Sequence, residues 1–334
     1  MAKKATYKNF LIIQTSFIGD AILASSLAEK LHTYFPQANI SILVRKGNES
    51  IYHQHPFLKD VLTWNKSKNK FSNLLRLIFD VRRNKYDCVI NCHRFASSGL
   101  ICAFSGAKHI SGFKQHPLSF LFNITVQHKI NSGLHETERY NQLVEDFTDT
   151  KVFKPKLYPS NLDFESIKPY QVEQYICVAP ASVWFTKQLP VKKWIELFTY
   201  ISPNTKIYLL GAQSDLDLCR SIVKQCGREN IQILAGQLTL LESCALMKNA
   251  KMNFTNDSGP LHLASSVNAP VVSFFLSTTP AFGFGPLSDS NYIVENLQLP
   301  CRPCGLHGYK SCPKKHFNCA LELDFLPHQQ HLTA

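Results

Sequence analysis

Short apolar runs alternate with segments of helical periodicity along most of the 334-residue chain. In its first half, strands are expected at residues 10–14, 40–44, 61–64 and 86–91, with helices directly after the first strand and over 69–83. The first helix carries an apolar stripe and ends before Pro36. This alternation is typical of α/β proteins with parallel sheets.

The same pattern restarts after a segment of different character. Residues 153–171 hold three prolines and show no clear period, which is typical of a linker. Beyond it, strands are expected at 175–179, 206–210, 231–234, 252–255 and 270–276, and helices at 191–201, 214–226, 239–250 and 260–267. We therefore predict domains at 1–170 and 171–334. Because open α/β sheets bind ligands beyond the carboxyl ends of their strands, a site is expected in a cleft between the two.

Composition is that of a globular protein, with 45% hydrophobic and 18% charged residues. The formal net charge of +12 favours anionic partners, such as phosphorylated ligands or an acidic membrane surface. The basic residues are dispersed and no nucleic-acid-binding motif occurs, so no nucleic acid partner is expected. No apolar run approaches the roughly 20 residues that span a bilayer, and the first apolar run is too short for a signal peptide. A cytoplasmic protein is expected.

The first strand is followed by the junction SFIGD, residues 16–20. Gly19 would allow a tight turn and a close approach to the backbone. Asp20 has two interpretations. It is a helix cap that complements the helix dipole, or a general base held at the carboxyl edge of the sheet.

Two further junctions suggest a phosphate-bearing ligand. Lys187, in a loop after a strand, is either an exposed charge or a cation that holds a phosphate. Asp257, Ser258 and Gly259 open a helix whose first turn contains His262, and helix N-termini bind anions. Neither G-x-G-x-x-G nor a P-loop motif occurs, which disfavours Rossmann dehydrogenases and P-loop NTPases.

Four of the eleven cysteines crowd into residues 301–319, with the spacing C-x₂-C-x₇-C-x₆-C. They are Cys301, Cys304, Cys312 and Cys319. The first pair has the spacing of a zinc knuckle, while the second pair is spread more widely than in common zinc ribbons. Two interpretations stay open: a structural zinc site, and four unliganded thiols in a bent loop. Disulfides are not expected in a reducing cytosol.

The segments TSFIGDAILASSLAEKLH, YDCVINCHR, PASVWFTKQLP and TNDSGPLHLASSVNAPVVSFF resemble, in this order, glycosyltransferase family 9, the ADP-heptose:lipopolysaccharide heptosyltransferases. The resemblance covers nearly the whole chain. It implies an α/β GT-B fold, in which the parallel sheets of two Rossmann-like domains face a central cleft. The first domain would bind the acceptor and the second the nucleotide-sugar donor.

The resemblance also implies an activity and its partners. Heptose would pass from ADP-heptose to the lipid A–inner core acceptor, with inversion and without a catalytic metal or other cofactor. The protein would be peripheral at the cytoplasmic face of the inner membrane, whose anionic surface suits the basic chain. Two alternatives stay open: a family-9 transferase with another nucleotide sugar or acceptor, and a non-catalytic nucleotide-binding protein.

Position by position, Asp20 matches the family's general base and Lys187 its diphosphate-binding lysine, so the resemblance favours the catalytic interpretation of both. The donor side would be completed by Ser182, Gln213, Asp257, Ser258, Gly259 and His262, and the acceptor side by Ser16, Gly19 and His93. Asn91 stands where members of the family commonly have Asp. That departure bears on the choice of acceptor more than on the chemistry.

Overall fold

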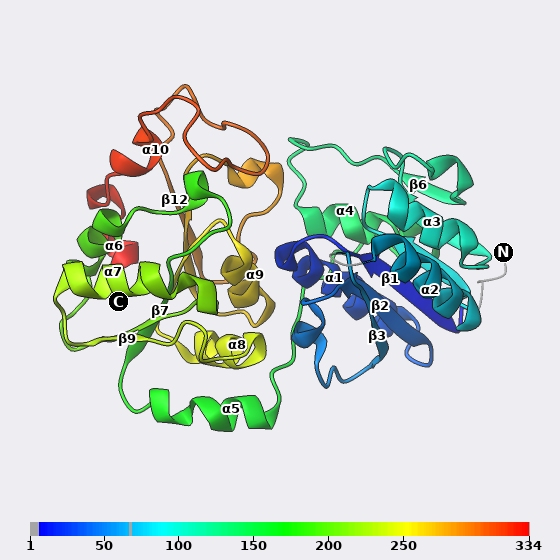
Figure 1. The fold of residues 1–334 in the computed structure, drawn as a ribbon, viewed down its shortest axis with the longest axis horizontal. Coiled ribbons are helices and arrows are strands. Elements are labelled where there is room, and N and C mark those ends of the chain that lie inside the picture. Colours follow the sequence, from blue (N-terminus) through cyan, green and yellow to red (C-terminus); the bar gives the residue numbers. More distant parts are fainter. Residues whose placement is uncertain (1–6, 67–68, 334) are drawn as a thin grey trace. The chain divides into compact units, whose positions relative to one another are not determined.

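The computed structural model describes residues 7–66 and 69–333 (Figure 1). Its strands are β1 Asn9–Gln14, β2 Asn39–Arg45, β3 Leu58–Trp64, β4 Cys88–Asn91, β5 His109–Phe113, β6 Ile124–Val126, β7 Tyr175–Ala179, β8 Lys206–Leu209, β9 Ile231–Ile233, β10 Asn253–Asn256, β11 Val271–Phe275 and β12 Asn291–Glu295. Its α-helices are α1 Ile18–Tyr34, α2 Lys70–Arg83, α3 Ala96–Phe104, α4 Glu136–Gln142, α5 Asn161–Ile167, α6 Val191–Phe198, α7 Leu216–Cys226, α8 Leu240–Asn249, α9 Gly259–Ser266, α10 Asn318–Leu321 and α11 Gln329–Leu332.

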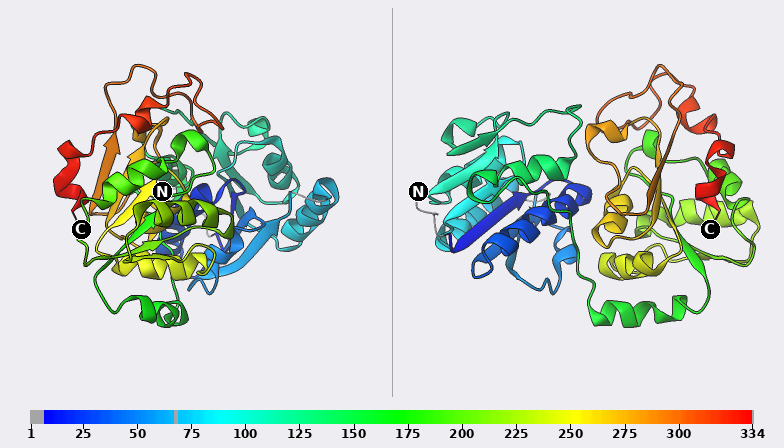
Figure 2. Two further views of the ribbon diagram at one scale, coloured as in Figure 1. Left: turned by 60° about the vertical axis from the view of Figure 1, so that its left-hand side comes forward. Right: turned by 180° about the vertical axis from the view of Figure 1, so that it is seen from behind.

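The chain forms two compact units, Met1–Tyr158 and Pro159–Ala334. Each unit contains a six-stranded sheet with helices on both faces (Figure 2). The strand orders are β3-β2-β1-β4-β5-β6 and β12-β11-β10-β7-β8-β9, and all the strand pairs are parallel. Both sheets thus have the doubly wound order, whose direction reverses beside the first strand of the unit. The prediction of an α/β protein with two Rossmann-like domains is confirmed.

Alternating residues of β1 separate the two faces of the first sheet. Leu11 and Ile13 pack with the buried side chains of α2 and α3. On the other face, the Gln14 side chain donates a hydrogen bond of 2.7 Å to the hydroxyl of Tyr140 on α4, which packs beside α1. Because successive side chains of a strand point to opposite faces, one strand serves both helix layers.

The second sheet is built in the same way. Ile176 and Val178 of β7 pack with Trp194 of α6 and with buried residues of α7. On the opposite face the hydroxyl of Tyr175 donates to the carbonyl of Leu246 on α8, at 2.9 Å. Helices α5 and α9 pack beside α8.

The division between the units falls earlier than predicted, at 158/159 in place of 170/171. Residues 153–171 were expected to be a linker without regular structure, but α5 lies inside them. Ser160 caps this helix, and Asp163 returns a bond to the N–H of Ser160, so the capping box S-x-x-D holds the helix start. Since α5 packs on α8, residues 159–171 belong to the second unit, while residues 153–158 belong to the first.

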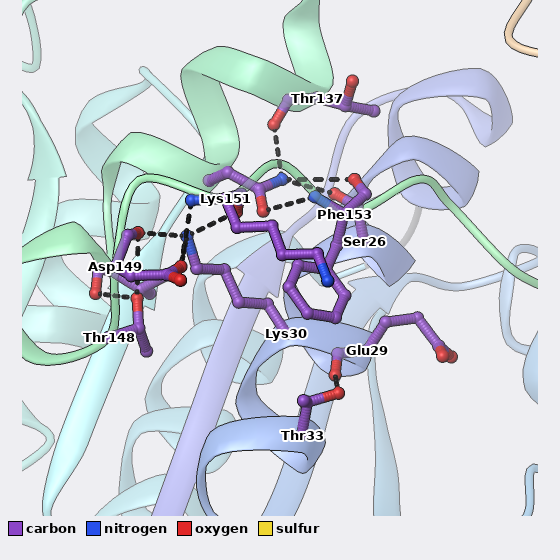
Figure 3. A network of polar contacts seen from close by, with 11 residues as sticks. Ser26, Glu29, Lys30, Thr33, Thr137, Thr148, Asp149, Lys151 and Phe153 are labelled. Carbon is purple, nitrogen blue, oxygen red and sulfur yellow. Dashed lines mark hydrogen bonds and ion pairs between the residues drawn. The ribbon is translucent and has the colours of Figure 1, made fainter.

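A buried lysine ties the end of the first unit to α1 (Figure 3). Lys30, whose side chain is fully buried, donates hydrogen bonds to the carbonyls of Asp149 and Lys151, at 2.5 and 2.8 Å. The Asp149 carboxylate lies 3.6 Å from the ammonium. The cost of burying this cation is thus offset by two carbonyls and one carboxylate.

We expect Lys30→Met to lower the free energy of unfolding of the first unit by about 2–3 kcal/mol, because two carbonyls lose a charged donor. Urea-induced unfolding of the wild type and the variant measures the difference. Arg76→Met, at an exposed position of α2, is the matched control and should change stability little. Equal midpoints for both variants would mean that other contacts hold the segment.

Candidate active site

Asp20 lies in the first turn of α1, directly after the carboxyl end of β1. The N-cap of α1 is Phe17, so the prediction that Asp20 is the cap is wrong. Asp20 is instead the third helical residue, and its carboxylate accepts hydrogen bonds from its own N–H and that of Phe17. Gly19 is helical and has no left-handed backbone, so the expected tight turn is also wrong.

The pKa of Asp20 is unusual for an aspartate. Burial raises it to about 7, and the negative charge of Glu136 contributes in the same direction. The backbone N–H groups of Asp20 and Phe17 and the cation of Arg94 lower it only in part. A carboxyl with a pKa near neutrality is suited to accept a proton from a reacting hydroxyl.

Behind Asp20 lies a buried charge network that the sequence did not reveal. Glu136, at the start of α4, has its carboxylate 3.0 Å from Nε2 of His128 and 2.8 Å from Nη1 of Arg139. Nδ1 of His128 lies 3.4 Å from Nη1 of Arg94. Burial alone would raise the pKa of Glu136, but His128 and Arg139 outweigh it and hold that pKa below its usual range. The charge that acts on Asp20 is therefore a firmly ionised carboxylate.

The acceptor-side candidates lie in the loops after β1 and β4. Nζ of Lys66 donates to the carbonyl and the hydroxyl of Thr15, at 2.7 and 3.0 Å, and Nδ1 of His93 lies 3.4 Å from that hydroxyl. Burial, and then the charge of Lys66, lower the pKa of His93 to about 3, so its ring is neutral near pH 7. The N–H of Ser16 donates to the side-chain carbonyl of Gln14, at 3.1 Å. His93 is thus bridged to Lys66 through Thr15, while Ser16 shapes the loop.

Asn91, the departure from the family pattern, shapes the turn that leads to α3. Its Oδ1 accepts the N–H of His93 at 3.1 Å, and its Nδ2 donates to the hydroxyl of Ser98 at 3.2 Å. The side chain is fully buried. Asn91 therefore fixes the backbone at His93 relative to the first turn of α3.

In the second unit the structure joins two predicted residues directly. Nζ of Lys187 lies 2.6 Å from Oδ2 of Asp257, and the hydroxyl of Thr278 donates to the same oxygen at 2.6 Å. The three residues follow β7, β10 and β11, which are neighbours in the sheet. The carboxyl ends of parallel strands meet at one edge, so residues far apart in the sequence form one charged group.

Three contacts hold the Lys187 loop in place. Asn256 accepts the N–H of Leu189 at 3.0 Å and donates to the carbonyl of Pro180 at 2.8 Å, which bridges both ends of the loop. The hydroxyl of Thr186 accepts the N–H of Tyr309 at 2.8 Å. Gly308 has a φ of +80°, and a Cβ there would lie 2.9 Å from Cγ of Lys187. The loop that contains Gly308 thus packs directly against the Lys187 stem.

Of the remaining donor-side candidates, four lie in the segments that carry Lys187 and Asp257, and Gln213 does not. Ser258 is the N-cap of α9, Gly259 is its first residue, and His262 is buried in the first turn. The hydroxyl of Ser182 accepts the N–H of Trp184 at 3.4 Å, within the Lys187 loop. Gln213 lies elsewhere, exposed after β8 and packed against Gly236.

The four C-terminal cysteines lie in the irregular segment after β12 and in the short helix α10. In residues 7–66 and 69–333, no group of three or more His, Cys, Asp or Glu side chains is arranged to hold a metal ion. The thiols are nonetheless neighbours, since burial and then Cys301 and Cys312 raise the pKa of Cys304. Sγ of Cys301 lies 3.9 Å from Nε2 of His316. Structural zinc at these cysteines stays a prediction.

Comparison with known proteins agrees with this geometry. The family model described as glycosyltransferase family 9 (heptosyltransferase) matches residues 74–314. A lipooligosaccharide heptosyltransferase 2 of Haemophilus influenzae is 24% identical over 318 residues, which cover 87% of this chain and 89% of that protein.

Two solved structures share the fold. One is a family 9 glycosyl transferase from Veillonella parvula, with a TM-score of 0.79, 19% identity and coverage of 89% of this chain and 88% of that one. The other is E. coli ADP-heptose lps heptosyltransferase II, with a TM-score of 0.74, 20% identity and coverage of 94% and 98%. Its fold confirms the GT-B prediction. The family match covers well over half of the sequence, and the chain therefore belongs to glycosyltransferase family 9, a family of glycosyltransferase enzymes.

Proposed function

We propose that this enzyme transfers a heptose from ADP-heptose to the inner core of lipopolysaccharide, with inversion and without a catalytic metal. The observation that carries the proposal is Asp20, a carboxyl at the carboxyl end of β1 with a pKa of about 7. Support for the substrates comes from the Haemophilus relative, a lipooligosaccharide heptosyltransferase, and from the E. coli structure of an ADP-heptose lps heptosyltransferase. In this proposal, Asp20 is the general base.

In this mechanism, an acceptor hydroxyl attacks the anomeric carbon of the heptose while Asp20 takes its proton. The bond from that carbon to the diphosphate oxygen breaks, and ADP leaves with the bonding electrons. Attack from the face opposite to ADP inverts the anomeric centre. The transition state resembles an oxocarbenium ion, as in glycoside hydrolysis.

Lys187 supplies a positive charge that stabilises the diphosphate of the leaving ADP. Asp257 holds its ammonium at 2.6 Å, and the other N–H donors of a lysine are available to diphosphate oxygens. The N-terminus of α9, eight residues long, adds the positive end of a helix dipole. These groups favour ADP most when its negative charge has developed, which lowers the barrier.

The acceptor is proposed to be lipid A with its inner core, met by the protein at the anionic cytoplasmic face of the inner membrane. The net charge of +12 supports this location. Within the described part of the chain, no helix has the length and apolar character to cross a bilayer. We therefore propose peripheral contact.

Asp20→Asn should retain ADP binding and lower the transfer rate by roughly 100-fold or more, the usual contribution of acid–base catalysis. The wild-type rate should also fall as the pH drops below about 7, because a protonated Asp20 cannot accept the hydroxyl proton. The measurement is initial-rate transfer from ADP-heptose to inner-core acceptors between pH 5 and 9.

The variant must lose this acid limb of the pH profile as well as the rate. Asp60→Asn, on β3, is the control and should leave both unchanged. Near-normal turnover of folded Asp20→Asn would reduce Asp20 to a support of the α1 N-terminus. Full ADP binding without any transfer by the wild type would favour a non-catalytic nucleotide-binding protein.

Lys187→Ala should weaken ADP-heptose binding and lower the rate of the chemical step by roughly 100-fold, as removal of a charge-stabilising group does elsewhere. Lys192→Ala, an exposed lysine at the start of α6, is the matched control. Binding is measured by titration calorimetry and the chemical step by single-turnover transfer. EDTA should leave wild-type transfer intact, and strict dependence on Mg²⁺ or Mn²⁺ would rule out this assignment.

The cysteine segment is proposed to take up structural zinc, on the strength of its C-x₂-C spacing. Protein purified without chelator should contain about one zinc per chain, and Cys301→Ser/Cys304→Ser should lose both the metal and several degrees of melting temperature. Cys226→Ser, at the partly buried C-terminal residue of α7, is a cysteine control outside the segment. No zinc in either protein, with equal melting temperatures, would leave reduced thiols only.

A further inference from the structure

Helix α2 has a second apolar face that the core of the first unit does not use. Its buried face consists of Leu74, Leu77 and Val81. Phe71, Leu75 and Phe79 lie at i, i+4 and i+8 on another side and are 79%, 59% and 70% exposed. Residues with this spacing form one stripe along a helix. Three large apolar side chains are thus held in water by a helix that is already anchored.

The neighbouring helix extends the stripe. On α3, Leu100 and Phe104 lie at i and i+4 and are 38% and 54% exposed. Nη1 of Arg82 on α2 donates to the carbonyl of Phe104 at 3.3 Å, and the helices share one core cluster. We call Phe71, Leu75, Phe79, Leu100 and Phe104 the α2–α3 apolar surface. Several large apolar side chains exposed on two neighbouring helices mark an interaction site.

This surface is accompanied by positive charge. Residues 70–85 contain five basic residues and one acidic residue, a net charge of 5 − 1 = +4. The basic side chains, all exposed, are Lys70, Arg76, Arg82, Arg83 and Lys85. Aromatic and leucine side chains beside lysine and arginine characterise helices that lie in the interface of an anionic membrane.

We propose that the α2–α3 apolar surface docks onto an anionic lipid bilayer. Its apolar side chains enter the headgroup region while the basic residues contact lipid phosphates. A second copy of this chain is a poorer occupant, because a symmetric contact would place two +4 segments against each other. Charge complementarity therefore favours an anionic lipid surface over a second copy of this chain.

The position of the surface suits the reaction. Helices α2 and α3 start after the carboxyl ends of β3 and β4, at the edge where Asp20 follows β1. Docking would bring this edge to the bilayer, so that the sugar of a lipid-linked acceptor reaches the base. In this step alone the inference rests on the proposed function, since binding to vesicles needs neither donor nor acceptor.

The test is sedimentation of the full chain with vesicles of phosphatidylcholine alone or mixed equally with phosphatidylglycerol. The variant Phe71→Ser/Leu75→Ser/Phe79→Ser should lower the partition coefficient for the mixed vesicles at least about tenfold. The matched control is Leu162→Ser/Val172→Ser/Leu297→Ser, three equally exposed residues of the second unit, and it should bind as the wild type does.

A charge variant examines the same surface independently. Lys70→Gln/Arg76→Gln/Arg83→Gln should lose roughly tenfold or more of the binding to mixed vesicles, and added salt should weaken wild-type binding. Equal binding by the wild type and both surface variants would overturn the proposal. So would a serine variant that retains vesicle binding but has a smaller mass in solution, which would assign the surface to a second copy.

Heptose transfer to a soluble inner-core fragment is measured separately. A wild type that binds mixed vesicles through this surface but transfers no heptose would contradict the proposed function and support the docking surface. A wild type that transfers heptose but binds neither kind of vesicle would support the proposed function and contradict the docking surface.

Discussion

A charged side chain that is removed from water must find a partner or change its protonation, and the candidate residues of each unit follow from this constraint. Lys30, Glu136 and Asp257 are buried and paired with opposite charges at 3.6, 2.8 and 2.6 Å. The Lys30 pair fixes the segment around Asp149, and the Asp257 pair fixes the loop that carries Lys187. Asp20 is treated differently. Its compensation comes from two backbone N–H groups and Arg94, while Glu136 works against it. Burial therefore raises its pKa to about 7. The cost of burying a charge, which the other side chains offset by pairing, thus makes the Asp20 carboxyl able to exchange a proton.

The charged group of Lys187, Asp257 and Thr278 depends on a brace that joins distant parts of the second unit. Arg302 donates to the carbonyls of Phe275 and Thr278 and to the carboxylate of Glu295, at 2.9, 2.7 and 2.9 Å. It thereby ties the segment after β11, which carries the hydroxyl that holds Asp257, to the end of β12. A few residues later Gly308 lies against the stem of Lys187. Both partners of the ion pair are thus positioned by the cysteine-containing segment, which makes the rigidity of that segment relevant to the site whether or not it binds a metal.

The sequence predicted the elements whose apolar pattern is long and regular. The strand expected at 175–179 is observed at those residues as β7, and the helix expected at 69–83 begins one residue later as α2. Strands β5, β6 and β12 were missed. β6 and β12 are edge strands with few fully buried residues, and β5, although buried, has an apolar run that Ser111 and Gly112 interrupt. The α5 capping box was present in the sequence but was hidden among prolines. The motifs identified Asp20, Lys187 and Asp257 as candidates, but they did not predict which residues surround them.

What motifs lack is the set of contacts that tertiary structure makes across long separations. Asp257 is 70 residues from Lys187 and 21 from Thr278 along the chain, as the residue numbers show, and no local pattern links them. Glu136 likewise acts on Asp20 across the unit. The charged groups of the two units consequently differ in character. The second unit holds its charges in a closed pair beside a helix N-terminus, which suits a ligand that arrives with its own permanent charge. The first unit holds the Asp20 carboxyl, whose pKa burial raises to about 7, and also Lys66, whose pKa burial lowers to about 8. Two groups of the first unit thus have pKa values near the physiological range, which suits an exchange of protons there.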